Sequence, residues 1–573
     1  MTTSSKFQIP ASLLFCATSA PLASPAQGSL FELAPDSECS DLLTTASQLA
    51  SFAPEILVNI ERDLDTYALE KKRKRWEHQR WIEEQTGALI DLPPADMIKL
   101  QLEEGRPRMH PLAVLSFLLF RGWLGGGKDA RFEVMLRESV SLGIFLRNLG
   151  QPFPGTSTIE ENLNALSIET REFILKAELA LAFEEELEDF ESLRIDSTHC
   201  ASASAYPTDS GTLTKLLCRL CARMQKLERI ALPACDPIQG TQLGEWSEEM
   251  RQLNYRICTL TSSSAIAAGK AEEQGKKNGT DGEKSENQAV GSQKESAKTK
   301  LRRELYCELY TKAQGALELL APMVGVVREQ IEEEESSPQI QARRELWMAV
   351  MEEDLQAAAK VIEQSRRRVC EGKKPSAQAK MPLSVSDLSA SFIEKGGWER
   401  VLGYRPQVGF SAKGLVTALL LPEGNVPDQG QLWLTVEESI KNTGVIPGVV
   451  TVDDGYTGKA ELLKVQEAGV EVVSFSGARG RALLGEEKWN DERYAQARRD
   501  RNGAESGISV LKGKVRFGQL SRTGIEAVRA EQLEKVLAAN ALKIVELRRR
   551  KYEEEQRRSW ASGLPGARKR KAA

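Results

Sequence analysis

The stretch Gly448-Val-Val-Thr-Val-Asp-Asp-Gly-Tyr456 decides the fold. Its run of Val and Thr predicts a short buried strand, and two acidic residues follow at the strand's end. Leu193–Asp196 repeats the pattern, an apolar strand that ends in an aspartate. A third carboxylate, Glu505, lies in a polar stretch with helical character. Two strand-end aspartates and a helix-borne glutamate therefore mark the candidate site.

The order of the elements around these residues predicts the fold class. Apart from the segment after the first strand, the order is three strands, a helix, a strand, a helix, a strand and a final helix, which is the ribonuclease H-like order. The predicted strands after the first are 408–411, 415–421, 448–453 and 470–475, and the predicted helices are 429–442, 459–468, 491–511 and 527–550. The first and fourth strands are neighbours in such a sheet, so Asp196 and Asp453 are predicted to converge.

The whole chain is predicted to hold an α/β ribonuclease H-like catalytic domain with a mixed five-stranded sheet, a large helical insert after the first strand and an all-α N-terminal module. The helices of that module suit DNA binding or dimerisation, and both remain open. The predicted divisions are a disordered leader 1–50, the helical module 51–190, the catalytic domain 191–206 and 400–545, the helical insertion 207–399 with a flexible linker 261–300, and a basic tail 546–573.

Charge is distributed unevenly along the chain. The formal net charge is −5, yet residues 478–573 hold 24 Lys/Arg against 13 Asp/Glu, a net of +11 that leaves −16 for the rest. Local field rather than total charge attracts phosphate, so the C-terminal part is predicted to meet nucleic acid. No apolar run reaches the length of a membrane span, and we expect a cytoplasmic protein without a membrane partner.

The cysteines and histidines argue against a zinc site. Nine cysteines are scattered, and only Cys218 and Cys221 form a CxxC pair. No second pair follows at zinc spacing, and the chain has three histidines. The cysteines are therefore predicted to be reduced thiols, with the CxxC pair one turn apart on a helix.

The three carboxylates suit phosphodiester cleavage. Two Mg²⁺ ions about 4 Å apart can polarise the nucleophile, stabilise the leaving oxygen and relieve charge on the phosphate. Asp196, Asp453 and Glu505 are the predicted ligands, with Mn²⁺ as an accepted substitute. At helical spacing Arg498, Arg501, Glu505 and Lys512 share one stripe. A metal ligand flanked by phosphate-binding cations is one interpretation of this stripe, and a solvated salt-bridge stripe is the other.

Three motifs resemble those of bacterial insertion-sequence transposases of the DDE type, in the ribonuclease H-like, retroviral-integrase superfamily. Arg194-Ile-Asp-Ser-Thr198 resembles the motif of the first aspartate. Asp453-Asp-Gly-Tyr456 resembles the second and selects Asp453 over Asp454. Arg501, Glu505 and Lys512 reproduce the Arg-x₃-Glu-x₆-Lys spacing of the third. The family has a Tyr three residues before this arginine, where this chain has Arg498.

The resemblance implies a DNA transposase. It implies binding to the terminal inverted repeats of its own element, hydrolytic nicking, and joining of the 3′-OH ends to target DNA, by a homodimer on DNA in the nucleoid. Asp209 and Asp454 are expected to support the metal ligands. The residues expected to contact DNA are Arg479, Arg481, Arg498, Arg501, Lys512, Lys514 and Arg516. The alternatives are a nuclease of the same fold without strand transfer and a non-catalytic DNA-binding remnant.

Overall fold

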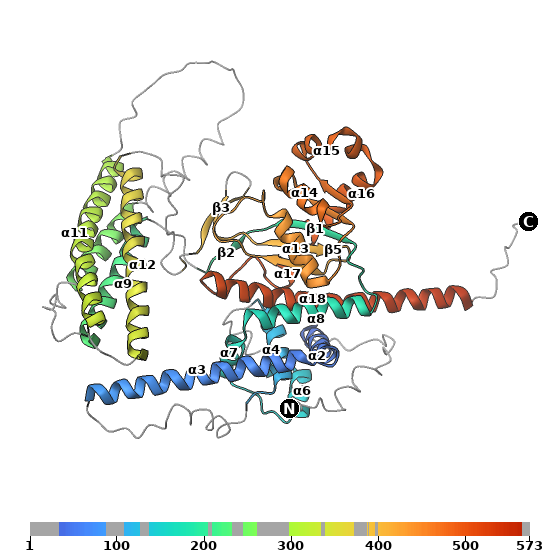
Figure 1. Cartoon of the computed structure of the whole chain (residues 1–573), viewed down its shortest axis with the longest axis horizontal. Helices are drawn as coiled ribbons and strands as arrows, with labels where there is room; N and C mark the ends of the chain where they lie inside the picture. The colour runs from blue at the N-terminus through green and yellow to red at the C-terminus, as the bar shows by residue number, and fades with distance from the viewer. Residues whose placement is uncertain are drawn as a thin grey trace, which may run out of the picture. The chain divides into compact units, whose positions relative to one another are not determined.

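The chain divides into two compact units. Unit 1 comprises Met1–Ala203 and Ser389–Ala573, and unit 2 comprises Ser204–Leu388. The computed structural model describes residues 34–86, 108–125, 137–203, 209–231, 244–260, 297–333, 338–371, 387, 389–395 and 399–563. Figure 1 shows both units, and each is described here by itself.

A mixed five-stranded sheet lies at the centre of unit 1, as the element order predicts. Its strand order is β6-β5-β1-β7-β8. β1 is antiparallel to β5 and parallel to β7, and β8 is parallel to β7. The strands are β1 (Ser192–Ser197), β5 (Gln407–Ser411), β6 (Val416–Leu420), β7 (Val449–Val452) and β8 (Val472–Phe475).

Helices cover both faces of this sheet because its strands are apolar on both sides. The helices that pack on the strands are α13 (Leu432–Thr443), α14 (Lys459–Glu467), α15 (Ala478–Asn490), α16 (Glu492–Asp500) and α17 (Asn502–Lys514). Ile195, Val452 and Phe475 are fully buried in the core between them. The predicted helix 491–511 is divided at Arg501, which lies between α16 and α17.

A second, three-stranded sheet was not foreseen. Its order is β2 (Cys200–Ala201), β4 (Glu399–Tyr404) and β3 (Ser391–Lys395). The predicted boundary of the insertion at residue 399 is therefore wrong, because β3 belongs to unit 1. Gly403 lets β4 approach β2 closely, since a Cβ there would lie 1.9 Å from the Cys200 carbonyl oxygen.

The N-terminal helices α2 (Ala34–Phe52), α4 (Pro111–Trp123) and α8 (Ile168–Glu184) pack on the long C-terminal helix α18 (Ile525–Gly563). Helices α3 (Glu55–Thr86), α6 (Val140–Asn148) and α7 (Thr156–Ala165) pack in turn on these N-terminal helices. Helix α2 corrects the predicted leader 1–50: Leu42 and Leu49 are fully buried, so apolar packing orders this segment. Residues 1–33 lie outside the described residues.

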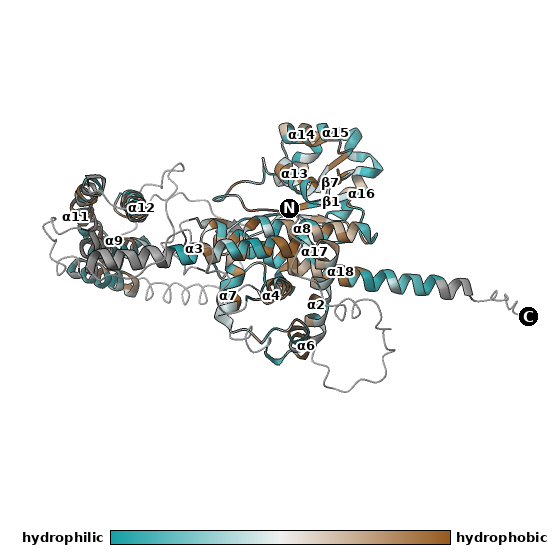
Figure 2. Cartoon of the chain, turned by 60° about the horizontal axis from the view of Figure 1, so that its bottom comes forward, coloured by the Kyte–Doolittle hydropathy of each residue, from teal (hydrophilic) through white to brown (hydrophobic). Residues whose placement is uncertain are grey.

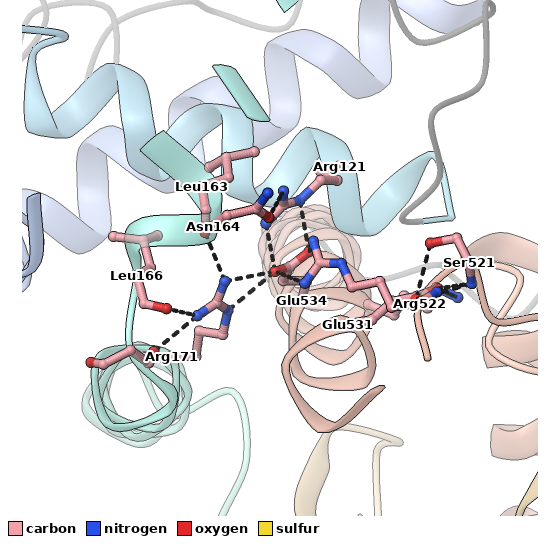
Figure 3. A network of polar contacts seen from close by, with 11 residues as sticks. Arg121, Leu163, Asn164, Leu166, Arg171, Ser521, Arg522, Glu531 and Glu534 are labelled. Carbon is pink, nitrogen blue, oxygen red and sulfur yellow. Dashed lines mark hydrogen bonds and ion pairs between the residues drawn. The ribbon is translucent and has the colours of Figure 1, made fainter. Parts of the chain in front are cut away.

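A buried ionic cluster joins α18 to the N-terminal helices. Glu534 of α18 accepts hydrogen bonds from Arg121 of α4, Arg171 of α8 and Arg522 (Figure 3). Gly122 allows the close contact beside it, because a Cβ there would lie 1.9 Å from the Glu534 carbonyl oxygen. The N-terminal helices and the catalytic sheet belong to the same compact unit, and α18 contacts both α4 and β6.

Helix α18 also runs through the predicted boundary at residue 546. Residues 549–558 of this helix are mostly exposed and hydrophilic (Figure 2). The predicted basic tail is therefore helical as far as Gly563, and residues 564–573 lie outside the described residues.

Unit 2 is helical over the residues that the structure describes. Its helices include α9 (Asp209–Ala231), α11 (Ala297–Glu333) and α12 (Pro338–Val369), which share a core of buried Leu, Met, Val and Ala side chains. The predicted linker 261–300 overlaps the start of α11 at Ala297, and residues 261–296 lie outside the described part. Among the helices described in either unit, none is long and apolar enough to cross a membrane.

Candidate active site

The sheet brings the two strand-end aspartates to one edge. Asp196 lies next to the last residue of β1, opposite Val408 of β5. Asp453 follows the last residue of β7, Val452. Because β1 and β7 are neighbouring parallel strands, their carboxyl ends lie at the same edge of the sheet. Residues separated by all of unit 2 in the sequence are thereby brought together.

Asp453 is oriented by two hydrogen bonds. Its Oδ1 accepts from the Asp454 backbone N–H at 2.7 Å and from Ser476 Oγ at 2.7 Å. It is the N-cap of a short 3₁₀ turn, Asp454–Tyr456, and its side chain is 46% exposed. The carboxylate is thus held by its neighbours and remains open to solvent.

Arg501 connects Asp453 with the third carboxylate. Its Nη2 lies 2.9 Å from Glu505 Oε1 and 3.6 Å from Asp453 Oδ1. Glu505 is in the first turn of α17, which packs on β1. The Nε of Arg501 is buried and has no hydrogen-bond partner. One guanidinium therefore lies among the acidic groups without all its donors being used.

Asp196 is electrostatically coupled to the same groups. Burial raises the pKa of Asp196 to about 6. The Ser197 backbone N–H and Arg501 lower it, whereas the negative charges of Asp453 and Glu505 raise it further. The three predicted carboxylates thus lie in one electrostatic environment, and their mutual repulsion is only partly offset by Arg501.

Asp454 has other partners than its neighbour. Its carboxylate accepts from the Gly480 N–H at 2.8 Å and pairs with Arg479 at 3.3 Å. Burial raises the pKa of Asp454, but these hydrogen bonds and the Arg479 charge outweigh it and lower the pKa below its ordinary value. Asp454 therefore caps the N-terminus of α15, consistent with a supporting rather than a metal-binding position.

The structure separates Arg498 from the predicted stripe. Its guanidinium lies 4.0 Å from the centre of the Trp489 ring and donates to the Trp489 carbonyl. Burial lowers the pKa of Arg498. The cation–π contact directs this side chain to α15, whereas Arg501 donates to Glu505 on the predicted face.

The other basic candidates differ in how they are held. Arg481 forms a bidentate pair with Glu486, at 2.8 and 2.9 Å. The stem of Lys512 lies beside Gly518, and Lys514 and Arg516 are exposed near the end of α17. Arg516 has a positive φ of 52°.

Asp209 has its described partner in unit 2. It begins α9 and pairs with Arg368 of α12. Its position explains the pairing, since an acidic side chain suits a helix N-terminus and Arg368 lies in the last turn of α12. Its described contacts are thus within the helical unit.

A supporting network near Asp196 escaped the sequence analysis. Arg405 donates to Ser197 Oγ at 3.2 Å and pairs with Asp428. Asp428 also accepts from Gln407, whose Oε1 accepts from the buried Tyr456 hydroxyl. This network ties β5 to the turn after β7. Tyr456 in the second motif was the one signal for it, since a buried tyrosine needs a partner for its hydroxyl.

The three carboxylates are chemically suitable ligands for a divalent cation. Carboxylate oxygens are the ligands that Mg²⁺ prefers, and a cation would relieve the repulsion acting on Asp196. In the described part of the chain, however, no three His, Cys, Asp or Glu side chains are arranged to hold an ion. Arg501 supplies the positive charge next to these carboxylates. Its buried Nε has no hydrogen-bond partner, so the polar groups of the site are not all satisfied.

Comparison with known proteins gives a family match over part of the chain. Residues 370–541 match the Transposase DDE domain family. This match supports a DDE transposase, a DNA-acting enzyme of a kind that generally uses divalent metal ions, and it implies a ribonuclease H-like fold. The match includes Asp453 and Glu505 but begins after Asp196, which joins the site only through the β1–β7 pairing. No curated protein and no solved structure matches the chain.

Proposed function

We propose that this chain is a bacterial insertion-sequence transposase that binds the terminal inverted repeats of its own element, cleaves them by two-metal hydrolysis and joins the 3′-OH ends to target DNA. The observation that carries the proposal is the grouping of Asp196, Asp453 and Glu505 around Arg501. These carboxylates come from two strands and a helix, and two of the three lie within the segment that matches the transposase domain.

The carboxylates are the proposed ligands of two Mg²⁺ ions, or Mn²⁺ in their place. When bound, these ions supply Lewis-acid polarisation of the attacking oxygen and neutralise charge on the phosphate. The chain's own part is to orient the ligands. Ser476 and the Asp454 N–H fix the Asp453 carboxylate, and Arg501 balances the acidic groups until metal and DNA arrive.

Two displacements at phosphorus make up the proposed reaction. Water first attacks a phosphodiester at the element's end, and the P–O3′ bond breaks to leave a 3′-OH. This hydroxyl then attacks a target phosphodiester, forming one P–O bond as another breaks, so no external energy is needed. Both steps use the same acidic site.

Basic side chains near the site are proposed to bind the DNA backbone. Lys514 and Arg516 are exposed at the end of α17, beyond Lys512 on the same helix. Arg501 would turn from the carboxylates toward phosphate when metal binds. Arg479 and Arg481 lie at the start of α15. We further propose a homodimer on DNA, acting in the cytoplasm at the nucleoid.

Strand transfer by purified protein tests this proposal against its rivals. The substrate is a labelled fragment that carries the DNA flanking the gene, mixed with supercoiled plasmid and Mg²⁺. Labelled ends joined to plasmid support the transposase. Cleavage without joining identifies a nuclease of the same fold, and binding without cleavage identifies a non-catalytic remnant.

A carboxylate outside the site serves as a control, because it shows whether losing any negative charge in this region is enough to stop the reaction. Glu492 lies on the adjacent helix α16, is exposed and pairs with Arg499. Glu492→Gln should leave joining unchanged, whereas Glu505→Gln should abolish it. Equal activity of the two variants would contradict the site assignment.

A further inference from the structure

Two cysteines that the sequence did not pair lie in contact in unit 2. Cys307 is on α11, and Cys370 directly follows the last residue of α12. Their sulfur atoms are 2.6 Å apart, although the residues are 63 positions apart in sequence. The CxxC pair singled out by sequence, Cys218 and Cys221, lies instead on a single helix, α9.

The surroundings fix both cysteines at one end of the helical bundle. The Cys370 N–H donates to the Arg366 carbonyl at 2.8 Å, and Arg303 of α11 donates to the Cys370 carbonyl. Arg368 pairs with Asp209 at the start of α9. Three helices thus meet where the two thiols touch, and little movement separates the thiols from bonding distance.

Contact between the sulfur atoms, together with partial exposure, singles out this pair. Cys307 and Cys370 are both partly exposed, as are Cys218 and Cys258, whereas Cys39, Cys200 and Cys221 are buried. Burial and the neighbouring thiol raise the pKa of Cys370 to about 11, although Arg303 and Arg366 act to lower it. The pair is reachable by a soluble oxidant and reacts faster as the pH rises, because the thiolate is the nucleophile.

We propose that Cys307 and Cys370 form a reversible disulfide that staples α11 to the end of α12. The oxidant is a small disulfide of the oxidised-glutathione class. One cysteine thiolate attacks its sulfur, and a glutathione thiolate leaves. The second cysteine attacks the mixed disulfide and releases the second glutathione. Two protein thiols are oxidised by two electrons, and one small disulfide is reduced to two thiols.

The bond would close a loop that contains most of α11 and all of α12. Closing such a loop restricts the unfolded chain, so the oxidised form of unit 2 resists opening more than the reduced form. In a reducing compartment the pair stays as dithiol, and the staple responds to oxidation. The disulfide does not depend on the proposed transposase activity.

Thiol mapping of the full-length protein tests the bond. The protein is equilibrated with oxidised and reduced glutathione at pH 8, alkylated, digested and analysed by mass spectrometry. We expect a peptide pair linking Cys307 to Cys370 that disappears on reduction. The proposal is wrong if Cys307 and Cys370 are still alkylated, and therefore still reduced, at a concentration of oxidised glutathione that already modifies other thiols of the chain. It is also wrong if either cysteine forms a disulfide with a different cysteine.

Limited proteolysis supplies a second measurement without any mutation. Oxidised wild type should be cut within α11 and α12 at least about tenfold more slowly than reduced wild type. Cys307→Ser and Cys370→Ser should each remove this difference, while the matched double variant Cys218→Ser/Cys221→Ser should keep it. A difference that survives in Cys370→Ser, or is lost in the double variant, would contradict the staple.

Discussion

Two charge clusters in unit 1 have opposite compositions. At Glu534, three arginines surround one carboxylate, and Glu534 is fully buried. At Arg501, one arginine pairs with Asp453 and Glu505, which are about half exposed, and its charge also lowers the pKa of Asp196. Both clusters join elements far apart in the sequence, but they balance charge in different ways.

The charges of the cluster around Glu534 are paired with one another inside the protein. Burial raises the pKa of Glu534, but Arg121, Arg171 and Arg522 outweigh it and hold the pKa at about 2. Backbone carbonyls accept the remaining Arg171 donors, including those of Leu163 and Ser167. With its charges paired inside protein, this cluster has a structural role (Figure 3).

The charges of the exposed cluster around Arg501 are not balanced. Burial raises the pKa of Asp196, the negative charges of Asp453 and Glu505 add to this rise, and one buried donor of Arg501 has no partner. A site that remains electrostatically unbalanced in the free protein is suited to bind cations and phosphate. The ratio of acid to base and the degree of burial, rather than the presence of ion pairs, therefore distinguish a binding site from a structural cluster.

Removing one ligand carboxylate should have the largest effect. Asp196→Asn and Asp453→Asn should each lower cleavage at least about a thousandfold, because a neutral amide cannot replace an anionic metal ligand. End binding should stay nearly intact in a gel-shift assay. Normal cleavage by either variant would remove that residue from the site.

Removing the carboxylate of Glu534 should lower the stability of the fold rather than act on the catalytic step. Glu534→Gln leaves the buried Arg121 and Arg171 and the partly exposed Arg522 without their anion and should cost about 3–5 kcal/mol. Denaturant unfolding followed by circular dichroism measures this loss. The exposed Glu555 on the same helix is the control, and Glu555→Gln should change stability by less than about 0.5 kcal/mol.

The same pair of variants gives a pH test. The pKa of Glu534 in the folded protein, about 2, lies below its ordinary value of 4.5. Its contribution to stability is therefore fully present above about pH 5 and is lost as the pH falls toward 2. Wild type should lose more stability than Glu534→Gln over this interval. Parallel acid profiles would contradict the assigned role.

A smaller effect is expected where α4 meets α18 beside this cluster. Gly122→Ala places a Cβ 1.9 Å from the Glu534 carbonyl, so the helices must separate, at a cost of about 1–3 kcal/mol. A Cβ added at Gly143 in α6 would meet no atom within 4 Å, and Gly143→Ala should be neutral or stabilising by up to about 1 kcal/mol. Thermal unfolding of the two variants measures this difference. Equal midpoint temperatures would contradict the close contact assigned to Gly122.

The smallest effect concerns the exposed cluster's DNA contacts. Lys512→Gln should weaken end binding and reduce the slope of log affinity against log salt by about one. The fold should be unaffected, because Lys512 is on the partly exposed side of α17. A salt slope equal to that of wild type would argue against phosphate contact at this position.

Local patterns were enough to predict much of the catalytic sheet. The β-branched runs and strand-end acids gave β1, β5, β6, β7 and β8 within a few residues of their observed bounds. The same patterns failed for β3 and for α2. Both depend on partners elsewhere, β3 on pairing with β4 and α2 on packing against α4 and α18.

The site was only partly foreseeable for the same reason. Helical spacing predicted the contact between Arg501 and Glu505, because residues four apart share a helix face. It also placed Arg498 on that face, but Trp489 of α15 holds this side chain instead. No spacing rule finds Ser476 beside Asp453 or Asp428 beside Arg405, since each contact joins separate segments of the chain.

By itself the sequence determined the five strands of the central sheet and most of the helices around them, since these follow from side-chain periodicity, and it singled out the three acids as candidates from the chemistry that each residue carries locally. Tertiary structure decided that Arg501 rather than Arg498 lies between Asp453 and Glu505, and that Glu534 joins α18 to the N-terminal helices α4 and α8. The pairing of β1 with β7 is the tertiary contact on which the predicted convergence of Asp196 and Asp453 depends. Strand pairing and burial set these outcomes, because charge balance depends on which segments meet and how much water remains between them.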